Sequence, residues 1–367
     1  MERKEFLKLC GILGFGLPAH FSLHACTTYE NLLFEFKGKV LIIGAGAGGL
    51  SAAYLLNQRG VDFEILEAST IYGGRMRINT SFADFPIPLG AEWLETKPSV
   101  FQEIVNNPQL KIDIKTVVDS PDRKFLGSSW FNFFEEYILP SIKTKIKYNE
   151  IVQTIDYSSE KIKVRTKNTV HLADKVIVSV PLKILQDKDV TFVPNLPQEK
   201  QDAIANMPIW EGFKAFFEFD ENFYGDGYEY AIRPETDGQK IYYNASFGQN
   251  TKKNILGLFV VGKPAREFLS LNDKDLKALI LNDLDKLFNK RATASYLKHI
   301  SQNWNAEPFI KSGYISDYAD WRDVKVLGKS VANKVYFAGG AYTDGEDWVS
   351  VHIAAQSAKI AVTELLK

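Results

Sequence analysis

The first strongly patterned part of the chain alternates short apolar runs with glycine. Lys39–Ile43 is a continuous apolar run rich in β-branched residues, which is typical of a strand buried on both faces of a parallel sheet. It leads directly into the glycine-rich segment Gly44–Gly49 and then into a helix-like stretch, Leu50–Arg59. Val61–Leu66 is the next apolar run, and Glu67 follows it. This order predicts the first strand–helix–strand unit of an α/β domain.

The rest of the chain carries patterns of both parallel and antiparallel strands. Short alternating runs in residues 146–166 predict an antiparallel meander, and the apolar run 173–180, stopped by Pro181, predicts another buried strand. Residues 273–289 have apolar side chains on one helical face, and residues 351–366 predict a long C-terminal helix. Further strands are predicted at residues 212–219, 255–262 and 334–340.

Gly44-x-Gly46-x-x-Gly49 has the spacing of a dinucleotide-binding loop. Gly44 permits the tight turn, Gly46 lets the backbone approach a pyrophosphate, and Gly49 lets the helix pack close to the strand. Glu67 ends the second strand, where a carboxylate accepts hydrogen bonds from ribose hydroxyls. The spacing alone is weak evidence, but its place between a strand and a helix favours a dinucleotide site over an ordinary glycine-rich loop.

Composition excludes several other functions. The chain has 44 basic and 45 acidic residues and no basic block, which argues against nucleic acid as a partner. Its two cysteines, Cys10 and Cys26, lie near the N-terminus. The body of the chain therefore has no disulfide, thiol nucleophile, cysteine-ligated metal or cysteinyl flavin. The five histidines show no metal-ligand spacing, so we predict no metal site.

Residues 1–26 resemble an export signal. Arg3-Lys4 precedes Phe6-Leu7-Lys8, as in a twin-arginine signal with lysine at the second position. The apolar stretch Leu9–Pro18 is too short to span a bilayer. Leu23-His24-Ala25-Cys26 resembles a bacterial lipobox, whose cysteine is lipidated after cleavage. We therefore expect a bacterial protein that is periplasmic or held at the membrane by a lipid anchor at Cys26; the alternative is a poorly ordered N-terminal arm.

Two further motifs connect these features to a known family. Tyr72-Gly73-Gly74-Arg75-Met76 follows the second strand, and Leu89-Gly90-Ala91-Glu92-Trp93 comes after it. With Gly44–Gly49 and Glu67, this ordered set resembles the flavin-containing amine oxidases, which include monoamine oxidases, polyamine oxidases and histone demethylases. The resemblance covers residues 39–367. It implies non-covalent FAD rather than NAD as the cofactor.

The resemblance also implies an α/β fold with two domains. A discontinuous Rossmann-type FAD-binding domain takes residues 36–96, 145–195 and 325–367, and a smaller α+β substrate domain takes residues 97–144 and 196–324. Arg75 is expected at the phosphate and ribityl region, Val152 at the adenine, and the last helix with its N-terminus at flavin N1 and C2=O. The implied cofactor residues are Gly44, Gly46, Ala47, Gly48, Gly49, Glu67, Arg75, Gly90, Ala91, Glu92, Trp93, Val152, Gly339, Gly340 and Val349.

The resemblance further implies which residues act on a substrate. Lys214 matches the family lysine that bonds a water near flavin N5, and Trp304 and Trp348 are the candidate aromatic faces around the amine. Glu95 matches a carboxylate of plant-type polyamine oxidases that steers a cationic amine, with an exposed loop carboxylate as the alternative. These roles imply oxidation of a small-molecule amine by hydride transfer to N5, with oxygen as acceptor. The alternatives are a flavin enzyme for a non-amine substrate and a non-catalytic FAD-binding subunit.

Three features depart from the family pattern, and one of them is the end of the C-terminal signature, Asp344-Gly345-Glu346-Asp347-Trp348, which does not match the usual sequence there. Gly340 stands where the family usually has glutamate, and the segment between Trp93 and Val152 is much shorter. Residues 125–139 are too apolar for a solvated loop, which predicts a reduced lid with Trp130 and Phe133 beside the flavin pocket. Simple packing of these side chains in the core is the alternative.

Overall fold

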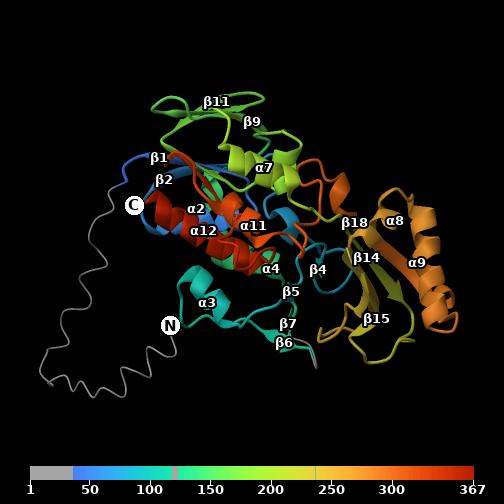
Figure 1. Cartoon of the computed structure of the whole chain (residues 1–367). Coiled ribbons are helices and arrows are strands. Elements are labelled where there is room, and N and C mark those ends of the chain that lie inside the picture. Colours follow the sequence, from blue (N-terminus) through green and yellow to red (C-terminus); the bar gives the residue numbers. More distant parts are fainter. Residues whose placement is uncertain (1–35, 118–122, 236) are drawn as a thin grey trace, which may run out of the picture. The chain divides into compact units, whose positions relative to one another are not determined.

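The computed structural model describes residues 36–117, 123–235 and 237–367 (Figure 1). The predicted export signal and Cys26 lie outside the described residues. Phe36–Lys367 forms one unit by its internal contacts. Within the described part of the chain, no helix is long and apolar enough to cross a membrane.

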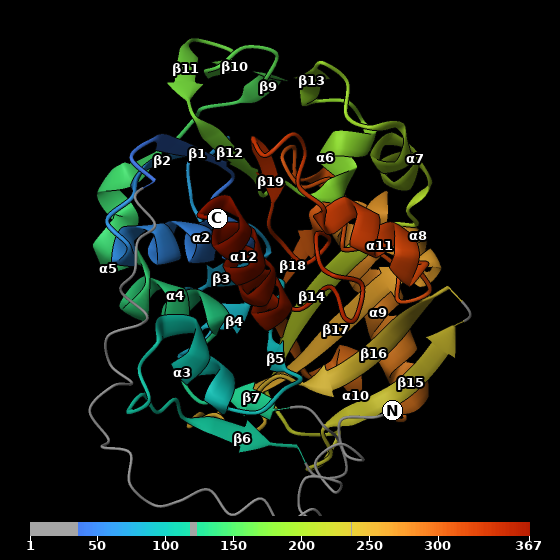
Figure 2. The same cartoon turned by 60° about the vertical axis from the view of Figure 1, so that its left-hand side comes forward.

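A parallel sheet of five strands forms the core of one half of this unit, in the order β19-β12-β1-β2-β8 (Figure 2). Val40, Leu41 and Ile42 are fully buried, as predicted for a strand that is covered on both faces. Since the first and last strands of the chain share this sheet, the predicted α/β fold that uses both ends of the sequence is confirmed. The strands are β1 (Lys39–Ile43), β2 (Asp62–Leu66), β8 (Ile146–Lys147), β12 (Lys175–Val178) and β19 (Val335–Phe337).

Helices α2 (Ala47–Gln58) and α12 (Val351–Leu365) pack side by side on one face of the sheet (Figure 2). Their apolar side chains form one core with Phe101 of α3 (Ser99–Val105) and with Phe133 of α4 (Trp130–Tyr137), next to α5 (Leu139–Ile142). The predicted lid is therefore wrong for Phe133, because the apolar face of α4 turns inward against α3. The predicted domain boundaries stay a prediction.

The other face of the sheet is covered by α6, α7 and α11 and by a smaller sheet in the order β11-β10-β9-β13. The predicted meander is present, although its first part, β8, pairs with β2 in the parallel sheet instead. These elements are β9 (Val152–Asp156), β10 (Ile162–Thr166), β11 (Val170–Ala173), β13 (Thr191–Val193), α6 (Leu182–Gln186), α7 (Gln198–Asn206) and α11 (Trp321–Gly328).

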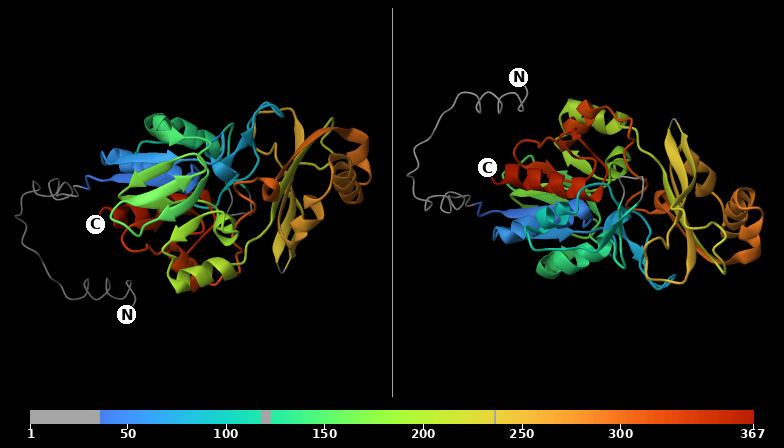
Figure 3. Two further views of the ribbon diagram at one scale, coloured as in Figure 1. Left: turned by 90° about the horizontal axis from the view of Figure 1, so that it is seen from above. Right: turned by 90° about the horizontal axis from the view of Figure 1, so that it is seen from below.

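A second five-stranded sheet, antiparallel and in the order β15-β16-β17-β14-β18, forms the other half of the fold. Figures 1 and 3 show α8 and α9 along the outer face of this sheet. Phe213 and Phe217 of β14 pack with α9, so the two-residue period of a strand turns Lys214 to the inner face. These elements are β14 (Gly212–Phe219), β15 (Glu229–Glu235), β16 (Gly238–Asn244), β17 (Asn254–Gly262), β18 (Tyr296–Asn303), α8 (Arg266–Leu269), α9 (Asp273–Leu287) and α10 (Arg291–Ser295).

Two small antiparallel sheets come from the segments that follow β2. One pairs β3 with β4, and the other has the order β5-β7-β6. Trp93 of β5 lies opposite Lys124 of β7, which brings the two segments together beside β14. The strands are β3 (Ile78–Asn79), β4 (Ile87–Pro88), β5 (Trp93–Leu94), β6 (Ile114–Thr116) and β7 (Arg123–Phe125).

Candidate active site

A cavity of about 640 Å³ extends from the glycine-rich loop after β1 to the inner face of β14. This volume is within the range of small-molecule and cofactor sites. Of the predicted site residues, the structure does not bring Gly49 and Trp348 to the cavity. The predicted residues that line it are Gly44, Gly46, Ala47, Gly48, Glu67, Arg75, Gly90, Ala91, Glu92, Trp93, Glu95, Val152, Lys214, Trp304, Gly339, Gly340 and Val349.

The loop between β1 and α2 has the geometry of a nucleotide cradle. Gly44 has a φ of 102°, and a Cβ there would lie 2.9 Å from the carbonyl oxygen of Ser179. A Cβ on Gly49 would lie 2.0 Å from the Gly44 oxygen, so Gly49 serves the packing of α2 behind the cavity wall. Gly46, in contrast, has no atom within 4 Å of its Cβ position among the described residues. Because the N-cap residue of α2 is Gly46, which has no side chain to cap the helix, the first amides of α2 can bind an anion.

Glu67 lies in the wall beside this loop. Its Oε2 accepts a hydrogen bond from the Ala45 amide at 2.6 Å, and its Oε1 accepts one from the Ser69 amide at 2.8 Å. Burial raises the pKa of Glu67, and the two amides and Arg77 oppose that rise. Each carboxylate oxygen keeps a lone pair for a further donor. The position therefore fits the hydroxyls of a ribose.

Arg75 is a partly buried cation with no carboxylate in ion-pair contact among the described residues. Its Nη1 donates to the carbonyl oxygen of Gly313, and burial lowers the pKa of Arg75. Arg77, on the same turn, is instead paired with Glu307 at 2.7 Å. A buried guanidinium needs a neighbouring anion. Because Arg75 lines the cavity, the phosphate of a dinucleotide fits as its partner, and this donor set fits FAD.

The turn between β19 and α12 explains why a glycine occupies position 340. A Cβ on Gly340 would lie 2.6 Å from the Val349 carbonyl oxygen, and the Val349 amide donates back to Gly340 at 2.9 Å. Val349 itself has a φ of 88°, which is strained for a β-branched residue and is common at functional sites. The turn brings the N-terminus of α12 to the cavity, where the Ser350 hydroxyl donates to Glu95 at 2.7 Å.

Lys214 reaches the cavity wall, but its ammonium group is fully occupied by the protein. Its Nζ donates to the carbonyl oxygens of Pro88 at 3.2 Å and Gly90 at 3.1 Å, and to Glu92 Oε2 at 2.6 Å. An ammonium has three N–H donors, so these partners use all of them. Burial lowers the pKa of Lys214, and Glu92 opposes that change. The expected contact with a water therefore requires Lys214 to release a partner or a proton.

Two tryptophans form fixed aromatic walls. The indole N–H of Trp304 donates to the Leu89 carbonyl at 3.0 Å, and the ring of Trp93 meets that of Phe259 edge-on, with centroids 5.2 Å apart. All three rings line the cavity, as does Trp130, the other residue of the predicted lid.

Trp348 does not belong to these walls, so its predicted role as an aromatic face is wrong. Its indole N–H donates to the Ser316 carbonyl at 3.2 Å, and its ring packs against the core beneath β12 and β19. The turn closed by Gly340 and Val349 directs Trp348 to that core and Ser350 to the cavity.

Sequence reasoning gave no role to two tyrosines of the cavity wall, Tyr314 and Tyr342. The Tyr342 hydroxyl donates to the Val180 carbonyl at 2.7 Å. Burial raises the pKa of both hydroxyls, and the charges of Asp317 and Glu95 add to the rise for Tyr314. The stretch from Trp304 through Pro308 to Gly313-Tyr314 resembles a W-x-x-x-P…G-Y segment that lies near the flavin ring in the family, and this was the available signal for Tyr314. Nothing in the local sequence distinguishes Tyr342.

The matches to known families agree with this geometry. The family model described as flavin containing amine oxidoreductase matches residues 134–366, more than half of the chain. The chain belongs to this family. A model described as an NAD(P)-binding Rossmann-like domain matches residues 42–107, which contain the glycine-rich loop and Glu67. FAD is therefore the cofactor, and the absence of cysteine after Cys26 agrees with non-covalent binding.

Individual relatives include oxidases and demethylases. Polyamine oxidase 1 of Zea mays is 22% identical over 462 residues, which cover 88% of this chain and 91% of that protein. Lysine-specific histone demethylase 1B of Mus musculus is 24% identical over 203 residues, and the match spans only 25% of its length. A solved structure of putrescine oxidase bound to putrescine aligns with a TM-score of 0.73 at 14% identity, covering 90% of this chain and 99% of that one. Identity this low shows the fold alone.

Proposed function

We propose that this protein oxidises a small amine, with bound FAD as the electron acceptor. One observation carries the proposal: a single cavity is lined by Glu67 and Arg75, which fit FAD, and by Trp304 and Lys214, which fit an amine oxidation site. Family membership supports the same reaction, and the maize relative is a polyamine oxidase.

The residues that would hold FAD have separate roles. The amides at the start of α2 would bind the pyrophosphate, Arg75 would balance its charge, and Glu67 would accept the ribose hydroxyls. When bound, FAD supplies the site, N5, that receives a hydride from the carbon next to the amine nitrogen. The N-terminus of α12, which lines the cavity, would stabilise negative charge on the bound flavin.

The remaining wall of the cavity suits an amine. Trp93 and Trp304 would exclude water and hold the substrate between fixed rings. Glu95 adds negative charge at the wall next to Ser350, which would draw a cationic amine toward the cavity. We propose oxygen as the acceptor of the electrons.

Anaerobic titration of the FAD-loaded protein with mono-, di- and polyamines tests the proposal. Amines should bleach the flavin absorbance, and air should restore it if oxygen is the acceptor. Bleaching by apolar polyenes or cyclic non-amine donors alone would identify a non-amine enzyme. A flavin that dithionite bleaches and no organic donor does would identify a non-catalytic subunit.

We also propose export, on the pattern of residues 1–26. In a bacterial host the full chain should appear in the membrane fraction and incorporate labelled palmitate, and Cys26→Ser should lose the label. Unlabelled wild-type chain in the cytoplasm would reject the export signal.

A further inference from the structure

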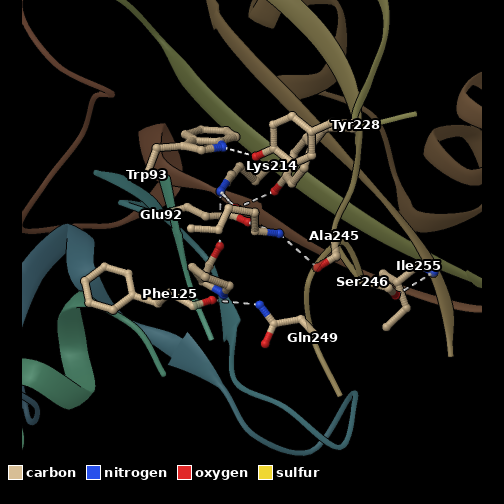
Figure 4. Close-up of polar contacts among 12 residues, drawn as sticks. Glu92, Trp93, Phe125, Lys214, Tyr228, Ala245, Ser246, Gln249 and Ile255 are labelled. Atoms are coloured by element: carbon tan, nitrogen blue, oxygen red, sulfur yellow. Dashed lines mark hydrogen bonds and ion pairs between the residues drawn. The ribbon is translucent and has the colours of Figure 1, made fainter. Parts of the chain in front are cut away.

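A buried ion cluster extends from the cavity wall behind Lys214 (Figure 4). Its members are Glu92, Lys214, Lys124 and Tyr243, with exposed fractions of 4%, 2%, 3% and 0%. Glu92 Oε2 accepts hydrogen bonds from Lys214 Nζ and the Tyr243 hydroxyl, both at 2.6 Å, and Glu92 Oε1 lies 3.2 Å from Lys124 Nζ. Lys214 and Glu92 line the cavity, whereas Lys124 does not. One carboxylate therefore joins a cavity lysine to a lysine outside the cavity wall.

The fold brings these groups together from three separate strands. Lys214 points inward from β14, Lys124 comes from β7, and Tyr243 comes from β16. Glu92 directly precedes β5, whose Trp93 lies opposite Lys124. Lys124 belongs to none of the motifs found in the sequence, and it is buried beside Glu92.

The two lysines are not held equally well. Lys214 donates to three oxygens, whereas Lys124 has the Ala245 carbonyl at 2.9 Å and the longer contact with Glu92. With every group ionised, two lysines and one glutamate carry a net charge of +1 in a buried site, which is unfavourable. Burial lowers the pKa of both lysines. The less well-held ammonium, that of Lys124, is the one expected to lose its proton.

Other polar groups near Lys124 do not supply a second carboxylate in the described residues. The rings of Tyr228 and Tyr243 lie 5.7 Å and 5.8 Å from Lys124 Nζ. On the neighbouring positions, Arg123 donates to the Thr96 carbonyl at 2.8 Å, and Lys115 of β6 lies over the Phe247 ring at 4.6 Å. Glu92 is thus the carboxylate through which Lys124 and Lys214 are connected.

We propose that Glu92 and Lys124 form a proton relay behind Lys214. The relay accepts the proton of Lys214, and Lys214 then takes the proton that an ammonium substrate must lose before oxidation. The proposal rests on the amine oxidase function above. At rest, Lys214 is an ammonium, Glu92 a carboxylate and Lys124 a neutral amine, so the cluster has no net charge.

The transfer balances in protons and charge. Lys214 gives a proton to Glu92 Oε2, the carboxyl group turns about its Cγ–Cδ bond, and Lys124 Nζ takes that proton. Neutral Lys214 then takes a proton from the substrate ammonium, which becomes an uncharged amine. The positive charge moves from the substrate ammonium to the cluster, so the total charge of substrate and cluster stays at +1.

Lys124→Met is the decisive variant. It leaves Glu92 and Lys214 as a balanced pair, and methionine fills the volume of the lost side chain, so folding should be retained. The double variant Glu92→Gln/Lys124→Met removes the acceptor and the carboxylate together and provides a second test. Lys115→Met is the matched control, because Lys115 is an exposed lysine that lies opposite Lys124 in the same small sheet.

Counting the protons released on amine binding tests the proton relay without any oxidation. The FAD-loaded protein is titrated at pH 8 with tert-butylamine, which has no hydrogen on the carbon next to nitrogen, by calorimetry in two buffers of different ionisation enthalpy. Wild type and Lys115→Met should release almost no protons, because the substrate proton stays on Lys124. Lys124→Met should release about one proton per amine bound. Equal counts in wild type and Lys124→Met would overturn the proposal.

The pH profile of anaerobic flavin reduction gives the second readout. At low amine concentration, the reduction rate of Lys124→Met should fall about tenfold for each pH unit below the pKa of the amine. Wild type should show a flatter pH profile, and the two reduction rates should converge near pH 10. Parallel profiles would overturn the proposed proton relay. If no amine binds to or bleaches the wild type, the proposed function itself fails, which is a different result from equal proton counts with an amine that does bind.

Discussion

Lys200, a buried lysine outside the ion cluster, should make the fold less stable at low pH than at high pH. It lies on α7, is 2% exposed, and donates to the Leu327 carbonyl of α11 at 2.6 Å. Its Nζ also lies 3.8 Å from the centroid of the Phe337 ring. Burial nevertheless lowers the pKa of Lys200 from 10.5 to about 7, because these contacts replace only part of the lost hydration.

The direction of the pH effect follows from this pKa. Between pH 7 and 10.5 the unfolded chain holds the Lys200 proton more often than the folded chain does, so the free energy of unfolding rises with pH across that window. At about 1.4 kcal/mol per pH unit, burial of Lys200 costs about 4.7 kcal/mol at pH 6, where the folded side chain is mostly charged. At pH 9 it costs about 2 kcal/mol, because folding removes a proton that the unfolded chain still holds. Lys200→Met removes this cost. The stability difference between variant and wild type should therefore shrink by about 3 kcal/mol from pH 6 to pH 9.

Urea unfolding of wild type and Lys200→Met at both pH values measures this difference, because titrations elsewhere in the protein cancel. Lys167→Met, at an exposed lysine, is the control and should stay within about 0.5 kcal/mol of wild type at both pH values. A wild type–variant difference that does not change with pH would refute the reasoning. It would mean that the contacts with Leu327 and Phe337 compensate fully for the burial of the charge.

Three further substitutions test the cofactor and active sites. Arg75→Met should weaken FAD binding to the apoprotein by about 1.5–3 kcal/mol, measured by fluorescence titration, and Arg77→Met should lose less because Glu307 already balances Arg77. Gly340→Ala should lower the unfolding free energy of the apoprotein by about 1–3 kcal/mol, whereas Gly46→Ala, with open space at its Cβ position, should not; equal effects would contradict the crowding at the turn. Lys214→Met should retain FAD and slow flavin reduction about 10²–10³-fold in stopped-flow measurements, and unchanged half-reactions would remove Lys214 from the site.

The parts of the fold that were predictable depend on short-range patterns. The apolar run 39–43 followed by glycine fixes a buried strand and the start of α2 within a few residues of where the structure has them. The amphipathic pattern of residues 273–289 likewise corresponds to α9, which ends at Leu287. Both features depend on one backbone segment and its own side chains, so no knowledge of distant segments is required.

The errors occur where distant segments decide the outcome. Trp348 follows the C-terminal motif closely, but the tight turn closed by Gly340 and Val349 sends its ring to the core instead of the cavity. Phe133 is apolar enough for either a lid or a core, and its contact with Phe101 of α3 places it in the core. Neither contact can be found from local periodicity, because each depends on tertiary packing.

In the active site, the sequence predicted where residues lie but not which partners they bind. The motif Leu89–Trp93 and the strand 212–219 place Glu92 and Lys214 at the cavity, and the structure brings them within 2.6 Å. Glu92 was expected as a cofactor residue, yet in this chain its carboxylate is bound by Lys214, Tyr243 and Lys124. The three N–H donors of Lys214 are therefore already bonded to protein oxygens before a substrate binds. If Lys214 acts on the substrate, as we propose, it must first release one of those bonds or a proton, and the second lysine at Glu92, Lys124, is the group that the proposed proton transfer requires.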